Sequence, residues 1–249
     1  MSDFITSKAN PKVKLAFSYQ QKPGDHFLVE GFHAVNMALE NQMVEELFLL
    51  KEDPKLKAPQ HIVTPEIIEK LALSQSPEGI VAVCHQKAEE PLSSDRVLYL
   101  DRIQDPGNLG TLLRTALSFG FHDVVLSAQT CSPFNSKALM AAQGAIFSLN
   151  VIRSKQESTL DISSLKKQGY FILGTALKDA VAFETFKESE PKLVLVLGNE
   201  GQGIEPAVLS LCDSRVKISM SGIDSLNVGV AGGILMHALA KSTLEWPDD

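Results

Sequence analysis

The stretch Ser219–His237, SMSGIDSLNVGVAGGILMH, decides how the rest of this 249-residue chain is organised. It follows a β-branched strand signal at Val216 and Ile218, bends at Gly222, and enters an apolar segment at Asn227 that holds three glycines. Each interior glycine costs about 1 kcal/mol relative to alanine in a helix. Such glycines indicate a helix that packs very close to another backbone or to a ligand. The stretch therefore predicts partners elsewhere in the chain.

Two earlier segments have the character of such partners, since each continues an apolar strand signal into a polar loop. Leu98–Gly120 places a loop at the carboxyl end of a strand, where open α/β sheets bind their ligands, and then a helix with Asn108 at the expected N-cap. Leu197–Ile204 is rich in glycine, which lets a ligand lie against backbone N–H and C=O groups. Taken singly, Asn108 is explained as a helix cap and Arg114 as a solvated arginine on the polar face of that helix.

The glycine-rich segment does not match the common nucleotide-binding fingerprints. Gly198, Gly201 and Gly203 stand in the wrong order for G-x-G-x-x-G, and no acidic residue follows a second strand at the expected distance. A P-loop is excluded because the sequence has no Gly-Lys-Ser/Thr. A nicotinamide-dependent oxidoreductase is therefore only a distant alternative.

The composition describes a globular protein without a membrane anchor or a general affinity for nucleic acid. The apolar fraction is 44% and the formal net charge is −7, so any RNA binding would depend on a local patch. Leu226–Ala240 is uncharged but shorter than the roughly 20 residues that span a bilayer. Residues 1–24 lack the apolar core of a secretory signal. They carry four lysines against one acid, which indicates either a solvated tail or a phosphate-contacting one.

The three cysteines, Cys84, Cys131 and Cys212, lie far apart and form no C-x-x-C pair. This spacing argues against a disulfide framework and against a zinc site, and no metal site is predicted. Unpaired cysteines fit a reducing compartment, and the cytoplasm is the simplest location.

Strand and helix signals alternate along the chain, which predicts an α/β fold. A small α/β unit ends near residue 87 with the strand signal Gly79–Cys84, and the polar segment Ala88–Asp95 is the best linker candidate. From Arg96 onward the alternation is regular, and it ends with a helix expected over Asn227–Leu244. Continuous apolar strands between helices predict a mainly parallel sheet covered on both faces.

Three motifs together resemble those of one enzyme family. They are D-x-x-x-D-P-G-N-x-G-x-x-x-R over Asp101–Arg114, L-G-N-E-G-x-G-I over Leu197–Ile204, and I-x-M-x-G-x-x-S-L-N-V over Ile218–Val228. In order and spacing they resemble the motifs of the SpoU/TrmH family of RNA ribose 2′-O-methyltransferases. FLVEGFHAV from Phe27 and SPEGIVAV from Ser76 resemble the small L30e-related domain that precedes many of these enzymes. The resemblance covers nearly the whole chain.

The resemblance implies a fold, a cofactor and an assembly. It implies an L30e-like RNA substrate-binding domain over residues 1–90, followed over residues 91–249 by a SPOUT methyltransferase domain with a parallel sheet and a deep trefoil knot. It further implies a homodimer that binds S-adenosylmethionine in the knot and methylates a ribose 2′-OH. The most similar members are the two-domain 23S rRNA guanosine methyltransferases. A tRNA substrate, or a non-catalytic RNA-binding or ribosome-assembly factor of the same fold, is the alternative.

The resemblance also assigns roles to residues at the matching motif positions. The implied catalytic set is Asn108, Arg114, Glu200, Ser225 and Asn227. Arg114 is expected to contact the substrate phosphate and the 2′-OH, as the base or through a proton relay, because arginine is a poor base. Asn108 and Glu200 would orient Arg114, while Ser225 and Asn227 would shape the pocket. The implied cofactor-binding set, mostly through backbone atoms, is Thr175, Leu197, Gly198, Gly201, Ile218, Met220 and Leu226.

The chain departs from the family pattern at three positions. Ser219 and Gly229, which flank the cofactor segment, replace a common proline and a common serine, so they bear on cofactor affinity. Glu78 replaces a common glutamine and adds negative charge to residues 1–90, which hold nine lysines, no arginine and thirteen acids. Weak or partner-assisted RNA binding is the expectation that follows.

Overall fold

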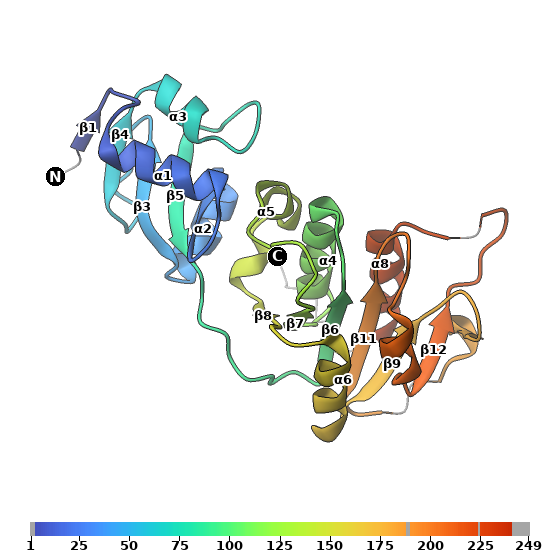
Figure 1. Cartoon of the computed structure of the whole chain (residues 1–249). Helices are drawn as coiled ribbons and strands as arrows, with labels where there is room; N and C mark the ends of the chain where they lie inside the picture. Colours follow the sequence, from blue (N-terminus) through green and yellow to red (C-terminus); the bar gives the residue numbers. More distant parts are fainter. Residues whose placement is uncertain (1–2, 188–189, 224, 241–249) are drawn as a thin grey trace, which may run out of the picture. The chain divides into compact units, whose positions relative to one another are not determined.

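The computed structural model describes residues 3–187, 190–223 and 225–240, and the chain divides into two compact units (Figure 1). The first unit contains Met1–Ala88 and Ser132–Ser148, and the second contains Glu89–Cys131 and Leu149–Asp249. None of the helices in the described ranges is long and apolar enough to cross a membrane. Both units combine a sheet with helices, which confirms the predicted α/β class.

The first unit is built on a mixed five-stranded sheet. Its strands, in spatial order, are β1 (Asp3–Ile5), β4 (Gln60–Val63), β3 (Val44–Leu49), β5 (Ile80–His85) and β2 (His26–Glu30). β1, β4 and β3 are parallel, whereas β5 runs antiparallel to both β3 and β2. The helices of this unit are α1 (Pro11–Gln21), α2 (Phe32–Glu40), α3 (Pro65–Leu71) and α5 (Ser136–Ala142).

The N-terminal residues belong to the first unit and do not form a tail. Asn10 caps α1 by accepting a hydrogen bond from the Lys12 N–H at 2.9 Å, and Pro11 takes the first helical position. α1 buries Val13 and Ala16 completely in the core of the unit. The interpretation of residues 1–24 as a solvated tail is therefore wrong for the described part. The interpretation as a tail relies on the lysines and gives no weight to Asn10-Pro11, which is the helix-start signal.

The segment Ser132–Ser148 joins the first unit although it is distant in sequence. The ring of Phe27 packs against Phe134 at a centroid distance of 4.6 Å and against Phe147, in η1 (Ala145–Phe147), at 6.3 Å. All three rings are buried. Such tertiary contacts do not affect the periodicity of strands or helices. The sequence-based first domain, residues 1–90, therefore leaves out Ser132–Ser148.

The second unit is built on a seven-stranded sheet in which every neighbouring pair is parallel. Its strands, in spatial order, are β10 (Val181–Ala182), β12 (Ser214–Lys217), β9 (Phe171–Thr175), β11 (Leu193–Gly198), β6 (Arg96–Asp101), β7 (Asp123–Leu126) and β8 (Asn150–Arg153). The central strands β11 and β6 are buried along their whole length. The predicted parallel sheet with continuous apolar strands is confirmed.

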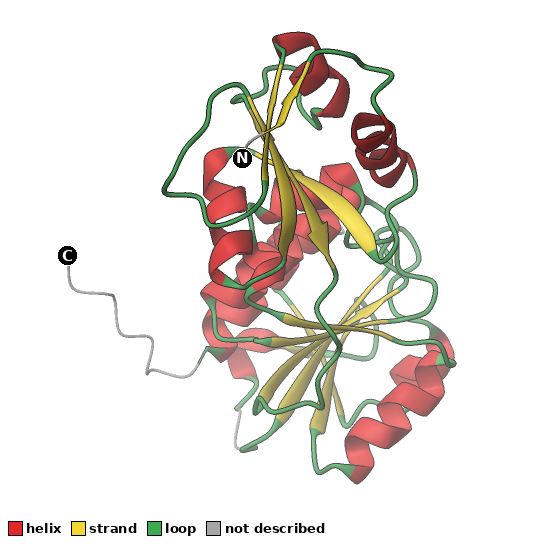
Figure 2. Ribbon diagram, turned by 90° about the vertical axis from the view of Figure 1, so that its left-hand side faces the viewer, coloured by secondary structure: helices red, strands yellow, loops and turns green. Residues whose placement is uncertain are grey.

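Helices cover both faces of this sheet (Figure 2). They are α6 (Ser158–Lys167) and α7 (Pro206–Ser210) on one face, and α4 (Pro106–Ser118) and α8 (Val228–Leu239) on the other. Ile162 of α6 and Val208 of α7 share a buried cluster with Tyr99 of β6. On the opposite face, α4 and α8 pack against each other and α8 contacts β11.

The final helix α8 packs as closely as its glycines predict. A Cβ added to Gly232 would lie 2.8 Å from Leu197 Cδ1 of β11 and would also overlap Leu112 of α4. Gly232 therefore allows α8 to approach the sheet and α4 at the same time. The sequence predicts this helix over Asn227–Leu244; it begins at Val228, and residues 241–244 lie outside the described ranges.

Candidate active site

The carboxyl ends of four neighbouring parallel strands meet at one edge of the second sheet. The strand order β12-β9-β11-β6 places these ends side by side, with Gly198 aligned with Asp101 and Val216 aligned with Thr175. The edge therefore collects the loop after β6, the glycine loop after β11 and the segment after β12. These are the three motif segments of the sequence.

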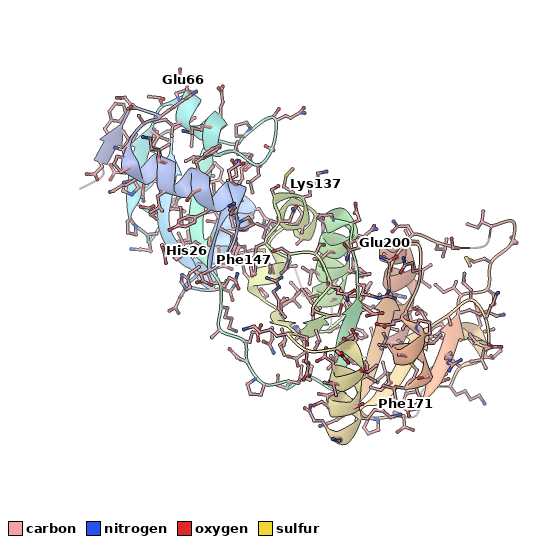
Figure 3. The ribbon with its side chains drawn as sticks, in the orientation of Figure 1. His26, Glu66, Lys137, Phe147, Phe171 and Glu200 are labelled. Atoms are coloured by element: carbon pink, nitrogen blue, oxygen red, sulfur yellow. The ribbon has the colours of Figure 1, made fainter. Side chains whose placement is uncertain are left out.

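Glu200, which is labelled in Figure 3, lies in the glycine loop and connects two of these segments through its carboxylate. Its Oε1 accepts hydrogen bonds from the Asp105 N–H and from Asn108 Nδ2, both at 3.1 Å, and its Oε2 accepts one from the Gln104 N–H at 3.3 Å. The third segment joins through Asn227, whose Nδ2 donates to Asn108 Oδ1 at 2.8 Å. The structure thus brings three of the five predicted catalytic residues into one hydrogen-bonded series, the Glu200–Asn108–Asn227 chain.

Asn108 is not the N-cap of α4, which corrects the sequence-based prediction. The cap is Asp105, whose Oδ1 accepts a hydrogen bond from the Asn108 N–H at 2.8 Å, and Pro106 takes the first helical position. Because Asp105 satisfies the helix start, the amide side chain of Asn108 is free to bridge the other two members of the chain.

Asn227 caps α8 and serves the site with the same side chain. Its Oδ1 accepts hydrogen bonds from the Gly229 and Val230 N–H groups at 2.8 and 3.3 Å. The amide nitrogen remains available for Asn108. The start of α8 therefore fixes the direction in which Asn227 presents its donor.

Arg114 and Ser225 stand apart from this chain. Both are exposed, and within the described ranges neither side chain makes a hydrogen bond or an ion pair. Arg114 lies on the polar face of α4, where the hydroxyls of Thr111, Thr115 and Ser118 each donate to a carbonyl of the same helix. The catalytic roles of Arg114 and Ser225 stay predictions.

The glycine loop can follow its path only with glycine at its first position. Gly198 ends β11, and a Cβ added there would overlap the backbone of Gly203 and Ile204. A side chain at Gly198 would therefore open the loop. Gly201 lies at the tip, where the nearest atom to an added Cβ is Asn199 Oδ1 at 3.8 Å.

The remaining predicted cofactor positions offer backbone and apolar groups. Thr175 ends β9, Leu197 is buried, and Ile218, Met220 and Leu226 are half-buried. None of these side chains carries a charge, and this donor set suits the adenosine part of S-adenosylmethionine, which needs apolar contacts and backbone hydrogen bonds. The residues present fit the cofactor, while binding by each of them stays a prediction.

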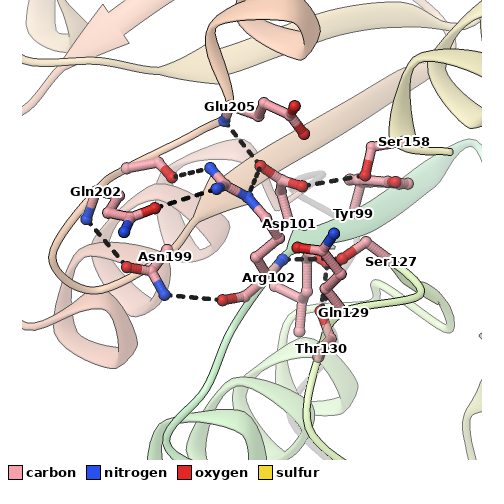
Figure 4. A network of polar contacts seen from close by, with 12 residues as sticks. Tyr99, Asp101, Arg102, Ser127, Gln129, Thr130, Ser158, Asn199, Gln202 and Glu205 are labelled. Atoms are coloured by element: carbon pink, nitrogen blue, oxygen red, sulfur yellow. Dashed lines mark hydrogen bonds and ion pairs between the residues drawn. The ribbon is translucent and has the colours of Figure 1, made fainter.

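Sequence reasoning assigns no role to Asp101 or Arg102, which lie at the base of the glycine loop (Figure 4). Asp101 is fully buried and accepts a hydrogen bond from the Glu205 N–H at 2.8 Å. Asp101 opens the first motif, and that position is a signal that could have found it. The backbone of Arg102 is left-handed, with φ at 59°, and an arginine in the sequence gives no signal for this conformation.

Cys131 lies close enough to the site for its acids to affect the thiol. Burial first, and then the carboxylates of Glu200 and Asp105, raise the pKa of the Cys131 thiol to about 11. The thiol is therefore neutral at pH 7 and supplies no thiolate nucleophile. In the described part of the chain, no group of three or more His, Cys, Asp or Glu side chains is placed to hold a metal ion.

The three departures from the family pattern each have a local structural explanation. Ser219 donates its N–H and its Oγ to the Glu184 carboxylate at 3.3 and 2.9 Å, and a proline could make neither bond. Gly229 keeps α8 close to α4, since an added Cβ would lie 3.2 Å from a methyl group of α4. Glu78 Oε2 accepts the Phe32 N–H at 2.9 Å and so completes the start of α2, whose N-cap is a glycine.

The chain is similar to proteins of a known family. Residues 95–237 match the SpoU rRNA Methylase family, and residues 28–90 match the domain described as RNA 2′-O ribose methyltransferase substrate binding. The chain is 34% identical over 246 residues to the 23S rRNA (guanosine(2553)-2′-O)-methyltransferase RlmP of Bacillus subtilis, covering 94% of this chain and 98% of that protein. An rRNA methyltransferase from Sinorhizobium meliloti has a similar solved structure, with a TM-score of 0.87 and 25% identity over 98% of this chain and 99% of that chain. The AdoMet-bound structure of an rRNA methyltransferase from the same organism gives a TM-score of 0.86 at the same identity and the same coverage of both chains.

The fold and the site therefore define a ribose 2′-O-methyltransferase of RNA. The chain belongs to the SpoU rRNA Methylase family. This membership confirms the resemblance carried by the three motifs.

Proposed function

We propose that this enzyme transfers the methyl group of S-adenosylmethionine to the 2′-OH of a guanosine in 23S rRNA. The observation that carries the proposal is the Glu200–Asn108–Asn227 chain, which ties the three motif segments together beside the glycine loop. The RlmP protein of Bacillus subtilis supports the substrate, since its name specifies a guanosine of 23S rRNA. The AdoMet-bound methyltransferase of Sinorhizobium meliloti supports the cofactor.

In this proposal, the residues of the site bind the cofactor, orient the substrate ribose and remove a proton from its 2′-OH. When bound, S-adenosylmethionine supplies an electrophilic methyl group. Gly198 and Gly201 offer backbone groups for binding, and Arg114 holds a phosphate next to the reacting ribose so that the 2′-OH lies in line for attack. The proton leaves the 2′-OH through Arg114 or through a relay over phosphate or water. Glu200 and Asn108 act on Arg114 through the start of α4, the helix that carries it.

We assign residues 1–90 to RNA substrate binding and residues 91–249 to catalysis. The match of residues 28–90 to a substrate-binding domain supports the first assignment. Phe32 is 45% exposed at the start of α2 and offers a ring on which an unpaired base can stack. Acids outnumber lysines in residues 1–90, so binding there depends on shape and stacking more than on phosphate contacts.

We also propose a homodimer formed through α4 and α8. Val230 and Ile234 lie one turn apart on α8 and are 52% and 43% exposed. The hydroxyls of Thr111, Thr115 and Ser118 on the polar face of α4 are satisfied within their own helix, so these three groups can be buried without being left unpaired. A second copy packed there would lie next to Arg114.

The C-terminal segment is proposed to form the trefoil knot. β12 lies near the outer end of the sheet, whereas α8, which follows it, returns to β11 and α4 near the centre. The close approach at Gly232 fits a threaded helix. A cytoplasmic location is proposed because all three cysteines are free.

The function is tested by transfer of labelled methyl from S-adenosylmethionine to total rRNA and tRNA from cells that lack the protein, followed by mapping of alkali-resistant linkages. The expected result is one resistant ribose in 23S rRNA, with no label entering rRNA from cells that have the protein. Label in tRNA would keep the enzyme class and overturn the substrate. Absence of label, together with absence of cofactor binding in calorimetry, would favour a non-catalytic RNA-binding or ribosome-assembly factor.

A further inference from the structure

The glycine loop, Gly198–Ile204, fixes its own shape and, through Glu200, its contact with the start of α4. The backbone groups of Asn199 and Gly203 pair at 3.0 and 2.9 Å, and Asn199 Oδ1 accepts the Gly201 and Gln202 N–H groups at 3.0 Å each. All of these bonds lie within the loop. Its position relative to the ends of β6 and β7 depends on a residue outside it.

Arg102, directly after β6, makes the required contacts (Figure 4). Its Nη1 donates to Gln202 Oε1 at 3.2 Å, and its Nη2 donates to the Gly203 carbonyl at 3.3 Å. Its own carbonyl accepts a hydrogen bond from Asn199 Nδ2 at 3.0 Å, and its N–H donates to Ser127 Oγ at 2.9 Å after β7. One residue thus holds the loop on both of its sides and is itself fixed to the neighbouring strand.

Asp101 anchors this arrangement from the core. Its fully buried carboxylate accepts hydrogen bonds from Arg102 Nε at 3.3 Å, from the Glu205 N–H at 2.8 Å and from Ser158 Oγ at 3.2 Å. Glu205 follows the loop directly, so the Asp101–Arg102 pair holds the loop along its length and at its exit. Hydrogen bonds to an ionised group such as the Arg102 guanidinium are stronger than those between neutral groups, so they can fix the position of the loop.

We propose that Arg102 is a positioning residue for the cofactor, because it holds the glycine loop, which carries Glu200, against the ends of β6 and β7. The inference rests on the proposed function, since it takes the loop as the cofactor-binding segment. The backbone of Arg102 has φ at 59°, a conformation in which glycine is the residue of least strain. The contacts of the arginine side chain with the loop offset that strain.

A substitution at Arg102 tests this hold on the loop. Arg102→Gly removes the side-chain bonds to the loop while relieving the backbone. We expect the Kd for S-adenosylmethionine, measured by calorimetry, to rise about tenfold, which matches the loss of one charge-assisted hydrogen bond. The thermal midpoint without cofactor should fall, because the buried Asp101 carboxylate loses its charged partner, so the midpoint alone does not test the positioning role.

A second readout does not need the cofactor. Hydrogen exchange of the amides of residues 199–205 should be faster in Arg102→Gly than in the natural chain, because the loop has lost its outer contacts. The matched control is Gln42→Gly, since Gln42 also has a left-handed backbone, with φ at 58°, but lies in the first unit. This control should leave both the loop exchange and the cofactor affinity unchanged.

The outcomes distinguish this inference from the proposed function. Unchanged exchange and unchanged cofactor affinity in Arg102→Gly would overturn the positioning role, and so would faster exchange spread over the whole second unit instead of confined to residues 199–205. If the natural chain binds no S-adenosylmethionine but the loop still loosens in Arg102→Gly, the proposed function fails while the hold on the loop stands. Gln202→Ala, which removes only one partner, should weaken cofactor binding less than Arg102→Gly does.

Discussion

Two parts of the active site differ in how far a single chain assembles them. The inner part, Glu200, Asn108 and Asn227, is joined by hydrogen bonds of 3.1 and 2.8 Å and tied to the starts of two helices. The outer part, Arg114 and Ser225, is exposed and has no side-chain partner in the described ranges. The fold therefore builds the frame of the site by itself, whereas the groups proposed to meet the substrate depend on RNA or a second copy. Substitutions in the two parts should accordingly separate activity from stability.

The largest effect is expected for Arg114→Ala in the outer part. Methyl transfer should fall about 1,000-fold, within the range typical of a lost proton-transfer or charge-stabilising group. The free energy of unfolding should change by less than about 0.5 kcal/mol, as for other exposed side chains. Transfer kinetics and urea unfolding measure these two quantities, and calorimetry with S-adenosylmethionine should show an unchanged cofactor affinity.

Lys167→Ala is the control for Arg114→Ala, because Lys167 is an exposed cation in the last turn of α6 on the opposite face of the sheet. It should leave transfer, cofactor affinity and stability unchanged. If Arg114→Ala lowered cofactor affinity and stability together with transfer, the outer part would be as fully assembled as the inner one. This result would contradict the division of the site into two parts.

Asn108→Asp tests the inner part with a smaller expected effect. The substitution removes the Nδ2 donor and places a second carboxylate beside Glu200, which repels it. We expect transfer to fall about 100-fold, the loss that follows from misplacing a reacting group by about 1 Å. The free energy of unfolding should fall by about 1 kcal/mol, because one hydrogen bond is lost.

Asn135→Asp is the matched control for Asn108→Asp. Asn135 caps α5 by accepting the Lys137 N–H at 2.9 Å, and aspartate caps a helix as well as asparagine does. The same chemical change should therefore be silent there. If Asn108→Asp leaves stability intact while abolishing transfer, Asn108 belongs with the outer part and the division between the two parts has to be redrawn.

Sequence patterns predicted the second sheet and the helices on it well, because continuous apolar strands and an amphipathic helix have fixed periods. The same patterns placed the cap of α4 at Asn108 instead of Asp105, since either residue type can cap a helix. The N-terminal helix α1 was hidden by a run of lysines, although Asn10 and Pro11 form a standard helix start.

Sequence predicted only those residues of the candidate site that occupy positions in the three motifs. The motif positions found Glu200, Asn108 and Asn227, and the structure joins them by hydrogen bonds. Arg102 could not be found from sequence, because its role depends on a left-handed backbone and on contacts with a loop about 100 residues away. Contacts of that range follow from the tertiary fold and not from local residue types.

The smallest effect concerns the packing of α8 beneath the inner part, where two adjacent glycines should respond in opposite directions. Gly232→Ala would overlap Leu112 and come within 2.8 Å of Leu197 Cδ1, so we expect a loss of about 2 kcal/mol in the free energy of unfolding. Gly233→Ala would meet only Thr115 Cγ2 at 3.8 Å and should gain up to about 1 kcal/mol from helix propensity. Urea unfolding of both variants measures the difference. Equal responses would show that α8 does not lie tightly on β11 and α4, and the start of α8 would then not hold Asn227 in place. Opposite responses would sharpen the comparison, because they would show that the helix start that holds Asn227 rests on a close-packed contact with β11 and α4.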